Sequence, residues 1–242
     1  MVKTKILKIK DKSDSYYTKK NKIWDLPFRL LINGKSQLSG KSTFILNLFR
    51  TSFYGNDFKG ENIYVCTNNK IDTKMKLLQE YKLIPDENFF SFDEDYLSAL
   101  YEIWEEDFIE AVSNADKPPN LCLILDDTAY SNALKSKQTG IISKIIMNGR
   151  HINLSSVFTS QKFSLIGTNI RSNVTGAVLF NTSQRELELI TDEFNYYENK
   201  KDFISMFRRE TLKPHSFLVV NFTNQGQGLY YDSEFNEVSL SQ

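Results

Sequence analysis

The chain has 242 residues, of which 40% are hydrophobic, and this is enough to bury a core in one large domain. Lysine plus arginine equals aspartate plus glutamate at 30 each, so the overall charge neither attracts nor repels nucleic acid. The N-terminus is rich in lysine but lacks the apolar segment of a signal peptide, and no apolar run approaches the roughly 20 residues that span a bilayer. We therefore expect an intracellular protein with no membrane segment.

The first 22 residues carry eight lysines against two aspartates, which is a local excess of positive charge. Such a segment is typical of a basic arm that lies along phosphates, and it is equally typical of a solvated tail. Its apolar residues at 6–9 favour pairing as an edge strand. We predict a basic N-terminal arm or edge strand over residues 1–24 and a single domain over residues 25–242.

From residue 28 onward, apolar runs of strand length alternate with segments of helical periodicity. The predicted strands are 28–32, 62–66, 89–92, 121–125, 155–159, 177–180, 216–222 and 229–231. The predicted helices are 44–49, 74–81, 96–114, 141–147, 184–194 and 203–209, and the polar segment 128–140 is predicted to be a loop. This alternation predicts an α/β sandwich with a mostly parallel sheet.

The two cysteines, Cys66 and Cys122, both lie within apolar runs of strand length. The only histidines, His151 and His215, do not stand at metal-ligand spacing from them. We therefore expect two buried thiols.

A loop rich in glycine, serine and lysine connects the first predicted strand to the first predicted helix. Gly40, Lys41 and Ser42 fit the end of the pattern GxxxxGKS/T, in which backbone amides and a helix N-terminus cradle the phosphates of a nucleotide. Lys41 would contact the β and γ phosphates, and Ser42 would ligate magnesium. Lys35 stands where the first glycine belongs and Gly34 comes one residue too early, so either the loop is one residue longer or GKS is a chance match in an ordinary turn. The residues predicted to bind the nucleotide are Ser36, Gln37, Leu38, Ser39, Gly40, Lys41, Ser42 and Thr43.

The most uniformly apolar run, 121–125, is predicted to be a central parallel strand, and Asp126 and Asp127 follow it directly. Two adjacent carboxylates at the end of a buried strand are costly unless a cation or a reaction uses them. Together with the upstream loop they form a Walker B motif, in which Asp126 would hold magnesium and Asp127 would activate water as general base. The alternative is that Asp127 caps a following turn. Gln161, directly after the strand at 155–159, is placed to contact the γ phosphate or its water.

Four segments in this order, GKSQLSGKST, LCLILDD, NGRHINLSSVFTSQ and NIRSN, resemble the FtsK and HerA superfamily of P-loop ATPases. They are most similar to the genome packaging ATPases of large double-stranded DNA viruses and virophages, over about residues 28–180. The resemblance implies a RecA-like (ASCE) three-layer α/β sandwich with a mostly parallel central sheet of order 5-1-4-3-2, plus C-terminal strands. It also places the strand at 155–159 between the P-loop and Walker B strands, and it identifies Gln161 as the sensor glutamine of the family.

The resemblance further implies that a neighbouring subunit offers an arginine to the transferring phosphoryl group. Arg150 occupies the corresponding position, and Arg171 is a second candidate. Arg150 could instead be a surface cation at a helix C-terminus, where positive charge is favoured. His151 is expected to pack or hydrogen-bond rather than to catalyse. Asp127 stands where many relatives have glutamate, so as a base it must approach the water more closely.

These features predict an ATP-driven translocase of double-stranded DNA that packages a viral genome into a preformed capsid. The implied cofactors are ATP and Mg²⁺, and the implied partners are DNA without sequence preference, further copies of the chain in a pentameric or hexameric ring, and a capsid or portal vertex protein. The implied location is the host cytoplasm or a viral factory, or the virion. Lys135, Lys137 and Lys162 are candidates for contact with DNA phosphates, although solvated loop lysines are equally expected.

Two other functions are compatible with the same P-loop. A small-molecule or nucleoside kinase should show an arginine-rich lid and an acceptor pocket, and neither is evident in the sequence. A nucleotide-binding assembly scaffold without motor activity would not need Lys41, Asp126 and Asp127, all of which are present.

Overall fold

The computed structural model describes residues 23–35, 39–50, 53–69, 72–127, 134, 140–223 and 229–238. Most of the predicted N-terminal arm lies outside these ranges, as do Ser36, Gln37 and Leu38 of the predicted phosphate loop and the lysines Lys135 and Lys137. Within the described ranges, no helix is long and apolar enough to cross a membrane.

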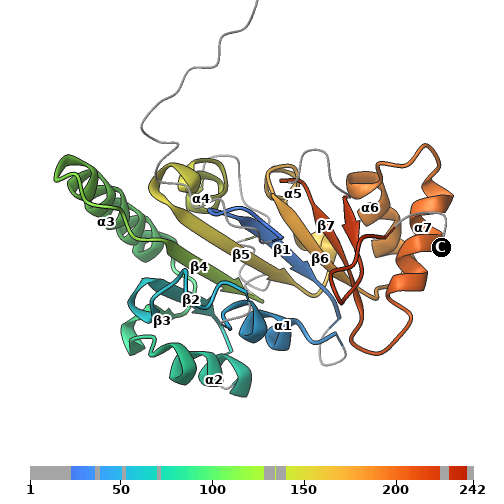
Figure 1. Cartoon of the computed structure of the whole chain (residues 1–242), viewed down its shortest axis with the longest axis horizontal. Helices are drawn as coiled ribbons and strands as arrows, with labels where there is room; N and C mark the ends of the chain where they lie inside the picture. The colour runs from blue at the N-terminus through green and yellow to red at the C-terminus, as the bar shows by residue number, and fades with distance from the viewer. Residues whose placement is uncertain are drawn as a thin grey trace, which may run out of the picture.

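Among the described residues, eight strands form one sheet (Figure 1). In chain order they are β1 (Arg29–Asn33), β2 (Ile63–Thr67), β3 (Phe89–Phe90), β4 (Leu121–Asp126), β5 (Leu154–Ser160), β6 (Gly176–Phe180), β7 (Phe217–Asn221) and β8 (Tyr230–Tyr231). Their order across the sheet is β3-β2-β4-β5-β1-β6-β7-β8. The pairs from β3 to β6 are parallel, whereas β7 is antiparallel to both β6 and β8.

Helices cover both faces of the sheet (Figure 1). One face carries α1 (Lys41–Leu48) and α2 (Thr73–Lys82). The other carries α3 (Glu94–Ser113), α4 (Ile141–Asn148), α5 (Thr168–Arg171), α6 (Gln184–Phe194) and α7 (Lys200–Glu210). Short 3₁₀ turns are η2 (Gly60–Asn62), η3 (Asp86–Asn88), η6 (Gly149–Ile152) and η7 (Phe163–Leu165). The fold is therefore the predicted three-layer α/β sandwich.

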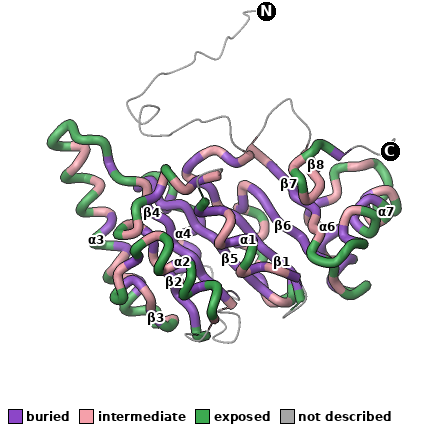
Figure 2. Tube along the Cα trace, turned by 60° about the horizontal axis from the view of Figure 1, so that its bottom comes forward, coloured by how far each residue is buried: buried purple, intermediate pink, exposed green. Residues whose placement is uncertain are grey.

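Residues along the strands pack alternately into two hydrophobic clusters, because successive side chains point to opposite faces of a sheet. In β1, Leu30 and Ile32 join the cluster beneath α1 and α2, whereas Leu31 joins the cluster beneath α3 to α7. The two cysteines are buried as predicted, Cys66 in the second cluster and Cys122 in the first. Figure 2 shows the central strands buried along their length, which explains why β4 is apolar at every position before its final aspartate.

All the predicted strands and helices from residue 28 onward are present, with ends that shift by at most three residues. The full order of the sheet differs from the implied 5-1-4-3-2 by three additional strands, since β3 extends one edge and β7 and β8 extend the other. Between these additional strands, the order is the implied one, β6-β1-β5-β4-β2. Strand β5, which precedes Gln161, lies between β1 and β4 as expected. Helix α5 was not predicted, because four residues are too few to show a helical period.

The carboxyl ends of the parallel strands lie together at one end of the sheet. We call this end the carboxyl edge and the opposite end the amino edge, as distinct from the outermost strands β3 and β8. Asn33, the last residue of β1, is paired with Ser160, the last residue of β5. Asp126, the last residue of β4, is paired with Thr67, the last residue of β2. The register therefore brings the predicted phosphate loop and the two predicted catalytic aspartates to the edge at which α/β sheets bind ligands.

Strand β7 returns the C-terminal part of the chain to the same edge. Because β7 runs antiparallel to β6, its first residue, Phe217, pairs with Phe180, the last residue of β6. A Cβ atom added to Gly40 would lie 3.6 Å from His215 Nδ1 and 3.9 Å from Phe180 Cε1. The segment before β7 therefore lies beside the loop that joins β1 to α1.

Candidate active site

The loop between β1 and α1 begins at Gly34, one residue earlier than the consensus pattern would place its first glycine. A Cβ atom at Gly34 would lie 2.7 Å from Ser39 Cβ and 2.8 Å from Phe180 Cβ, so the position has no room for a side chain. The hydroxyl of Ser39 donates to the carbonyl of Lys35 at 2.7 Å and closes the loop on itself. Gly40, before the first residue of α1, has φ 94°, which favours glycine. Both described ends of the loop therefore favour glycine, Gly34 for lack of space and Gly40 for its backbone conformation.

The side chain of Lys41 is buried against this loop, with 6% of the residue exposed. Its Nζ donates to the carbonyl of Gly34 at 2.7 Å. Burial lowers the pKa of Lys41, while the negative charges of Asp127 and Asp126 raise it, so the lysine lies near both carboxylates. A phosphate oxygen could replace the carbonyl of Gly34 as a stronger, charged partner for the ammonium group.

Asp126 is held at the end of β4 by a threonine of the neighbouring strand. The hydroxyl of Thr159 donates to Asp126 Oδ1 at 2.8 Å and accepts the backbone N–H of Asp127 at 2.9 Å. Burial raises the pKa of Asp126 to about 6, the nearby charges of Asp127 and Asp72 also raise it, and the hydrogen bond from Thr159 opposes the shift. A carboxylate with 5% exposure and these neighbours is a ready ligand for a cation.

Asp127 has the left-handed backbone conformation, with φ 47°, which few residues other than glycine adopt. Gln161 Nε2 donates to Asp127 Oδ2 at 3.0 Å, so the predicted sensor residue orients the predicted base. Asp127 Oδ1 is buried and has no hydrogen-bond partner among the described residues. This oxygen therefore has unused capacity to accept a hydrogen bond.

The segment after Gln161 is fixed by a buried carboxylate. Glu186 of α6, with 8% exposure, accepts the backbone N–H of Ser164 at 2.9 Å and its hydroxyl at 2.8 Å. Phe163, which lies between Gln161 and Ser164 in the sequence, is fully buried and anchors the same turn. These contacts hold the position of Gln161 from the far side of the sheet.

An unpredicted aspartate approaches the phosphate loop from α2. Ser42 Oγ donates to Asp72 Oδ2 at 3.1 Å. Asp72 Oδ1 accepts the backbone N–H groups of Lys74 and Met75, at 2.8 and 3.1 Å, and thereby caps α2. The side chain of Lys74 also hydrogen-bonds the hydroxyl of Thr43. The sequence contains the capping signal before residues 74–81, but only the fold brings that cap to α1.

The oxygen donors beside the loop suit a magnesium ion that arrives with a nucleotide. Ser42 and Asp126, the predicted ligands, both line the cavity, and Asp72 lies between α1 and α2 at the same place. No group of three or more His, Cys, Asp or Glu side chains could hold a metal on its own within the part of the chain that the structure describes. Mg²⁺ is usually bound by one or two carboxylates plus substrate phosphates, so the side chains present fit this ion.

The two candidate arginines lie at the opposite edge of the sheet from the phosphate loop. Arg150 in η6 precedes β5, and Arg171 in α5 precedes β6, so both stand at the amino ends of parallel strands. Arg150 is exposed, and its Nε donates to His151 Nε2 at 3.4 Å. Arg171 is paired with Glu193 at 3.5 Å and lies 5.1 Å above the ring of Phe163. Neither arginine lines the cavity of its own chain, and Arg150 is the more accessible of the two.

The cavity at the carboxyl edge has a volume of about 1030 Å³. Its polar lining includes Ser39, Gly40, Lys41, Ser42, Thr43, Asp72, Asp126 and Asp127. Gln161 reaches it through Asp127, and Lys162, the next residue, is exposed. The fold and the site together define a P-loop ATPase.

The family is shown by the sequence itself. A family model described as Poxvirus A32 protein matches residues 16–238, and the chain belongs to this family. No curated protein matches the sequence closely enough to be significant.

Solved structures share the fold at low identity. The genome packaging NTPase B204 of Sulfolobus turreted icosahedral virus 2, in complex with AMPPCP, has a TM-score of 0.57 and 16% identity over 87% of this chain and 98% of that one. B204 of Sulfolobus turreted icosahedral virus, described as a DNA-packaging ATPase, has a TM-score of 0.59 and 15% identity over 88% and 99%. ATPases 2 and 3 of EssC from Geobacillus thermodenitrificans have a TM-score of 0.52 and 15% identity over 71% of this chain and 35% of that one. These matches confirm the fold expected from the resemblance.

Proposed function

We propose that this chain hydrolyses ATP to move double-stranded DNA into a preformed viral capsid. The observation that carries the proposal is the connected set Asp126, Thr159, Asp127 and Gln161 beside the buried Lys41. Membership of the Poxvirus A32 protein family and the fold shared with the packaging ATPase B204 support the same conclusion.

Each side chain of the set has a role in hydrolysis. Lys41 leaves the carbonyl of Gly34 and binds the β and γ phosphates at the N-terminus of α1. Ser42 and Asp126 hold Mg²⁺, which neutralises charge on the phosphates. Asp127 Oδ1 accepts a proton from the attacking water, while Gln161 keeps the carboxylate turned toward it.

Assembly into a ring completes the site. Arg150 lies too far around the sheet to serve its own cavity, but its exposed guanidinium can enter the cavity of a neighbouring copy. In a pentamer or hexamer every cavity would receive one such arginine, so hydrolysis would depend on assembly. Arg171 is the weaker candidate, because Glu193 and Phe163 already occupy it.

DNA and a capsid or portal vertex protein are the proposed partners of the ring. Lys162 is exposed directly after Gln161, so a cation beside the site of hydrolysis is available to the DNA backbone. Lys135 and Lys137 are proposed to act in the same way. Contacts to phosphate alone make the interaction independent of base sequence and weaker at high salt.

The first test is the ATPase rate of the purified chain with and without long double-stranded DNA. We expect DNA to stimulate turnover. Lys41→Ala should abolish turnover, because the phosphates of ATP lose the lysine ammonium group that binds them. Asp127→Asn should bind ATP normally but lose at least about a hundredfold in turnover, since a positioned base contributes that much or more. Turnover that ignores DNA would favour a kinase, and unchanged turnover in Asp127→Asn would rule out the assigned base.

A further inference from the structure

The cavity that begins at the phosphate loop continues into a second half lined by aromatic rings. We call the residues Phe44, Phe53, Phe180, Phe217 and Phe235 the aromatic wall. They come from α1, the turn after it, the end of β6, the start of β7 and the segment after β8. Parts of the chain that are distant in sequence therefore supply one surface of the cavity.

The aromatic wall is a connected set of ring contacts. The ring centroid of Phe217 lies 5.2 Å from that of Phe44, 5.2 Å from that of Phe180 and 6.1 Å from that of Phe235. The ring centroids of Phe53 and Phe235 are 5.2 Å apart. The three contacts of Phe217 are steeply inclined, as aromatic pairs prefer, so the wall is already formed without a ligand.

Part of the ring surface of the aromatic wall is exposed to the cavity. Phe53, Phe217 and Phe235 are only partly buried, although all three sit in a hydrophobic cluster. Partly exposed aromatic side chains gathered in one concavity are typical of a ligand site. The charged half of the same cavity lies at Lys41 and Asp126, so the cavity passes from ionic to aromatic lining.

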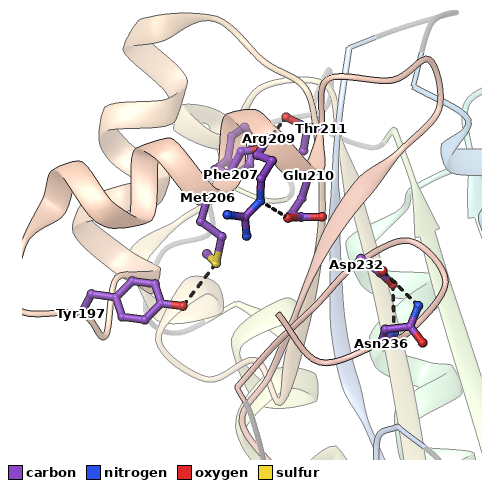
Figure 3. A network of polar contacts seen from close by, with 8 residues as sticks. All are labelled: Tyr197, Met206, Phe207, Arg209, Glu210, Thr211, Asp232 and Asn236. Atoms are coloured by element: carbon purple, nitrogen blue, oxygen red, sulfur yellow. Dashed lines mark hydrogen bonds and ion pairs between the residues drawn. The ribbon is translucent and has the colours of Figure 1, made fainter. Parts of the chain in front are cut away.

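The position of Phe235 is fixed by a turn after β8. Asp232 Oδ1 accepts the backbone N–H groups of Glu234 and Asn236 at 2.8 and 2.9 Å. Asn236 Nδ2 donates to Asp232 Oδ2 at 3.1 Å, and Figure 3 shows the contacts between these two residues. The backbone N–H of Phe235 donates to the carbonyl of Asp232 at 3.0 Å, and its φ is 65°. Four hydrogen bonds accepted by one aspartate therefore hold a phenylalanine in a left-handed conformation, which is a structural cost that a binding role would explain.

We propose that the aromatic wall binds the purine base of the nucleotide by stacking while the phosphate loop binds its phosphates. The inference rests on the proposed function, because it assumes that a nucleoside triphosphate enters the loop. The volume of about 1030 Å³ reaches the upper end of the usual range for ligand pockets, about 300 to 1,000 Å³, and so accommodates a whole nucleotide. Stacking on aromatic side chains typically changes affinity by about 10- to 100-fold per base.

Binding of ATP and of inorganic tripolyphosphate to the full chain, both with Mg²⁺ and followed by calorimetry, separates the two halves of the cavity. The variants are Phe235→Ala, which removes a ring near the C-terminus, and Phe217→Leu, which keeps apolar volume but removes the aromatic face. Phe222→Ala is the matched control, because Phe222 is a partly buried phenylalanine just after β7 that packs on Phe194 and Tyr196, away from the cavity. Lys41→Ala reports on the phosphate loop.

We expect Phe235→Ala and Phe217→Leu to weaken ATP binding at least about tenfold and to leave tripolyphosphate binding unchanged, which also shows that each variant is folded. Phe222→Ala should match wild type with both ligands. Unchanged ATP affinity in both wall variants would overturn the proposal, and so would an equal loss for ATP and tripolyphosphate. Lys41→Ala should weaken both ligands, and if it affects neither, the failure lies in the proposed phosphate site and not in the aromatic wall.

Discussion

The two edges of the parallel sheet carry opposite kinds of chemistry. At the carboxyl edge, Asp126 and Lys41 are buried and Asp127 is half-buried, and hydrogen bonds within the chain hold each of them. At the amino edge, Arg150 is exposed and forms no ion pair within the described residues. Its positive charge, together with burial, lowers the pKa of Arg29. One edge therefore holds charged groups that contact one another, and the other carries an exposed cation, which is the basis for the proposed action of Arg150 on a neighbouring copy.

The largest change in turnover is expected when Arg150 is removed. We expect Arg150→Ala to lower the turnover of the assembled, DNA-stimulated protein by about a thousandfold, because an arginine finger contributes at least that much. ATP binding to a single chain should be unchanged, since Arg150 does not line the cavity of its own chain. Steady-state ATPase assays and equilibrium nucleotide binding measure the two effects separately.

Mixed assemblies test whether the arginine acts between copies. Asp127→Asn supplies a normal Arg150 beside an inactive site, and Arg150→Ala supplies an intact site without its arginine. We expect two nearly inactive proteins to regain turnover when mixed. Arg171→Ala is the control, and its turnover should stay near that of wild type, because this arginine is already paired with Glu193. Activity that does not return on mixing would argue against action in trans.

At the carboxyl edge, Thr159 hydrogen-bonds both aspartates but does not line the cavity. Thr159→Val keeps the shape of the side chain but removes the hydroxyl that orients Asp126. We expect about a 10- to 100-fold loss in Mg²⁺ affinity, the usual effect of losing a group that holds a metal ligand. The Mg²⁺ dependence of ATP binding measures it, and Thr159→Ser should restore most of the affinity. Equal Mg²⁺ affinity in Thr159→Val and wild type would show that Asp126 needs no such support.

The features that the sequence predicted are those carried by short contiguous segments. The phosphate loop and the Asp126–Asp127 pair each stand directly after an apolar strand, so local pattern was enough to find them. Thr159 was placed in a strand, but its role depends on the register between β4 and β5, which no local pattern contains. Asp72 was invisible for the same reason, since it lies 30 residues from its partner Ser42.

The C-terminal strands show the same limit on a larger scale. Both β7 and β8 were predicted as strands, but their antiparallel return to the edge of β6 was not. That return brings Phe217 and Phe235 to the cavity, so the aromatic wall could not be inferred from sequence. The early position of Gly34 was noticed in the sequence as an irregularity, and only the structure shows that Ser39 and Phe180 leave no room for a side chain there.

The buried charge at the carboxyl edge should also lower the stability of the nucleotide-free protein. The pKa of Asp126 is raised from 3.8 to about 6, first by burial and then by the charges of Asp127 and Asp72. Between these pH values the folded chain binds more protons than the unfolded chain, so the free energy of unfolding falls as pH rises from about 4 to about 6. Above that window the ionised carboxylate costs on the order of 3 kcal/mol.

Asp126→Asn removes the charge and keeps an acceptor for Thr159. We therefore expect this variant, in urea with EDTA and no nucleotide, to be more stable than wild type by about 1 to 2 kcal/mol at pH 7.5 and nearly equal to it at pH 4.5. Asp116→Asn, which removes an exposed carboxylate, is the matched control for the loss of a carboxylate. Saturating ATP and Mg²⁺ should reverse the order at pH 7.5, because a ligand that binds the folded state stabilises it and only the carboxylate holds the cation. An Asp126→Asn protein that is less stable than wild type at pH 7.5 without ligand would contradict this prediction. It would mean that Lys41 and Thr159 already offset the cost of the buried charge of Asp126 before a nucleotide binds.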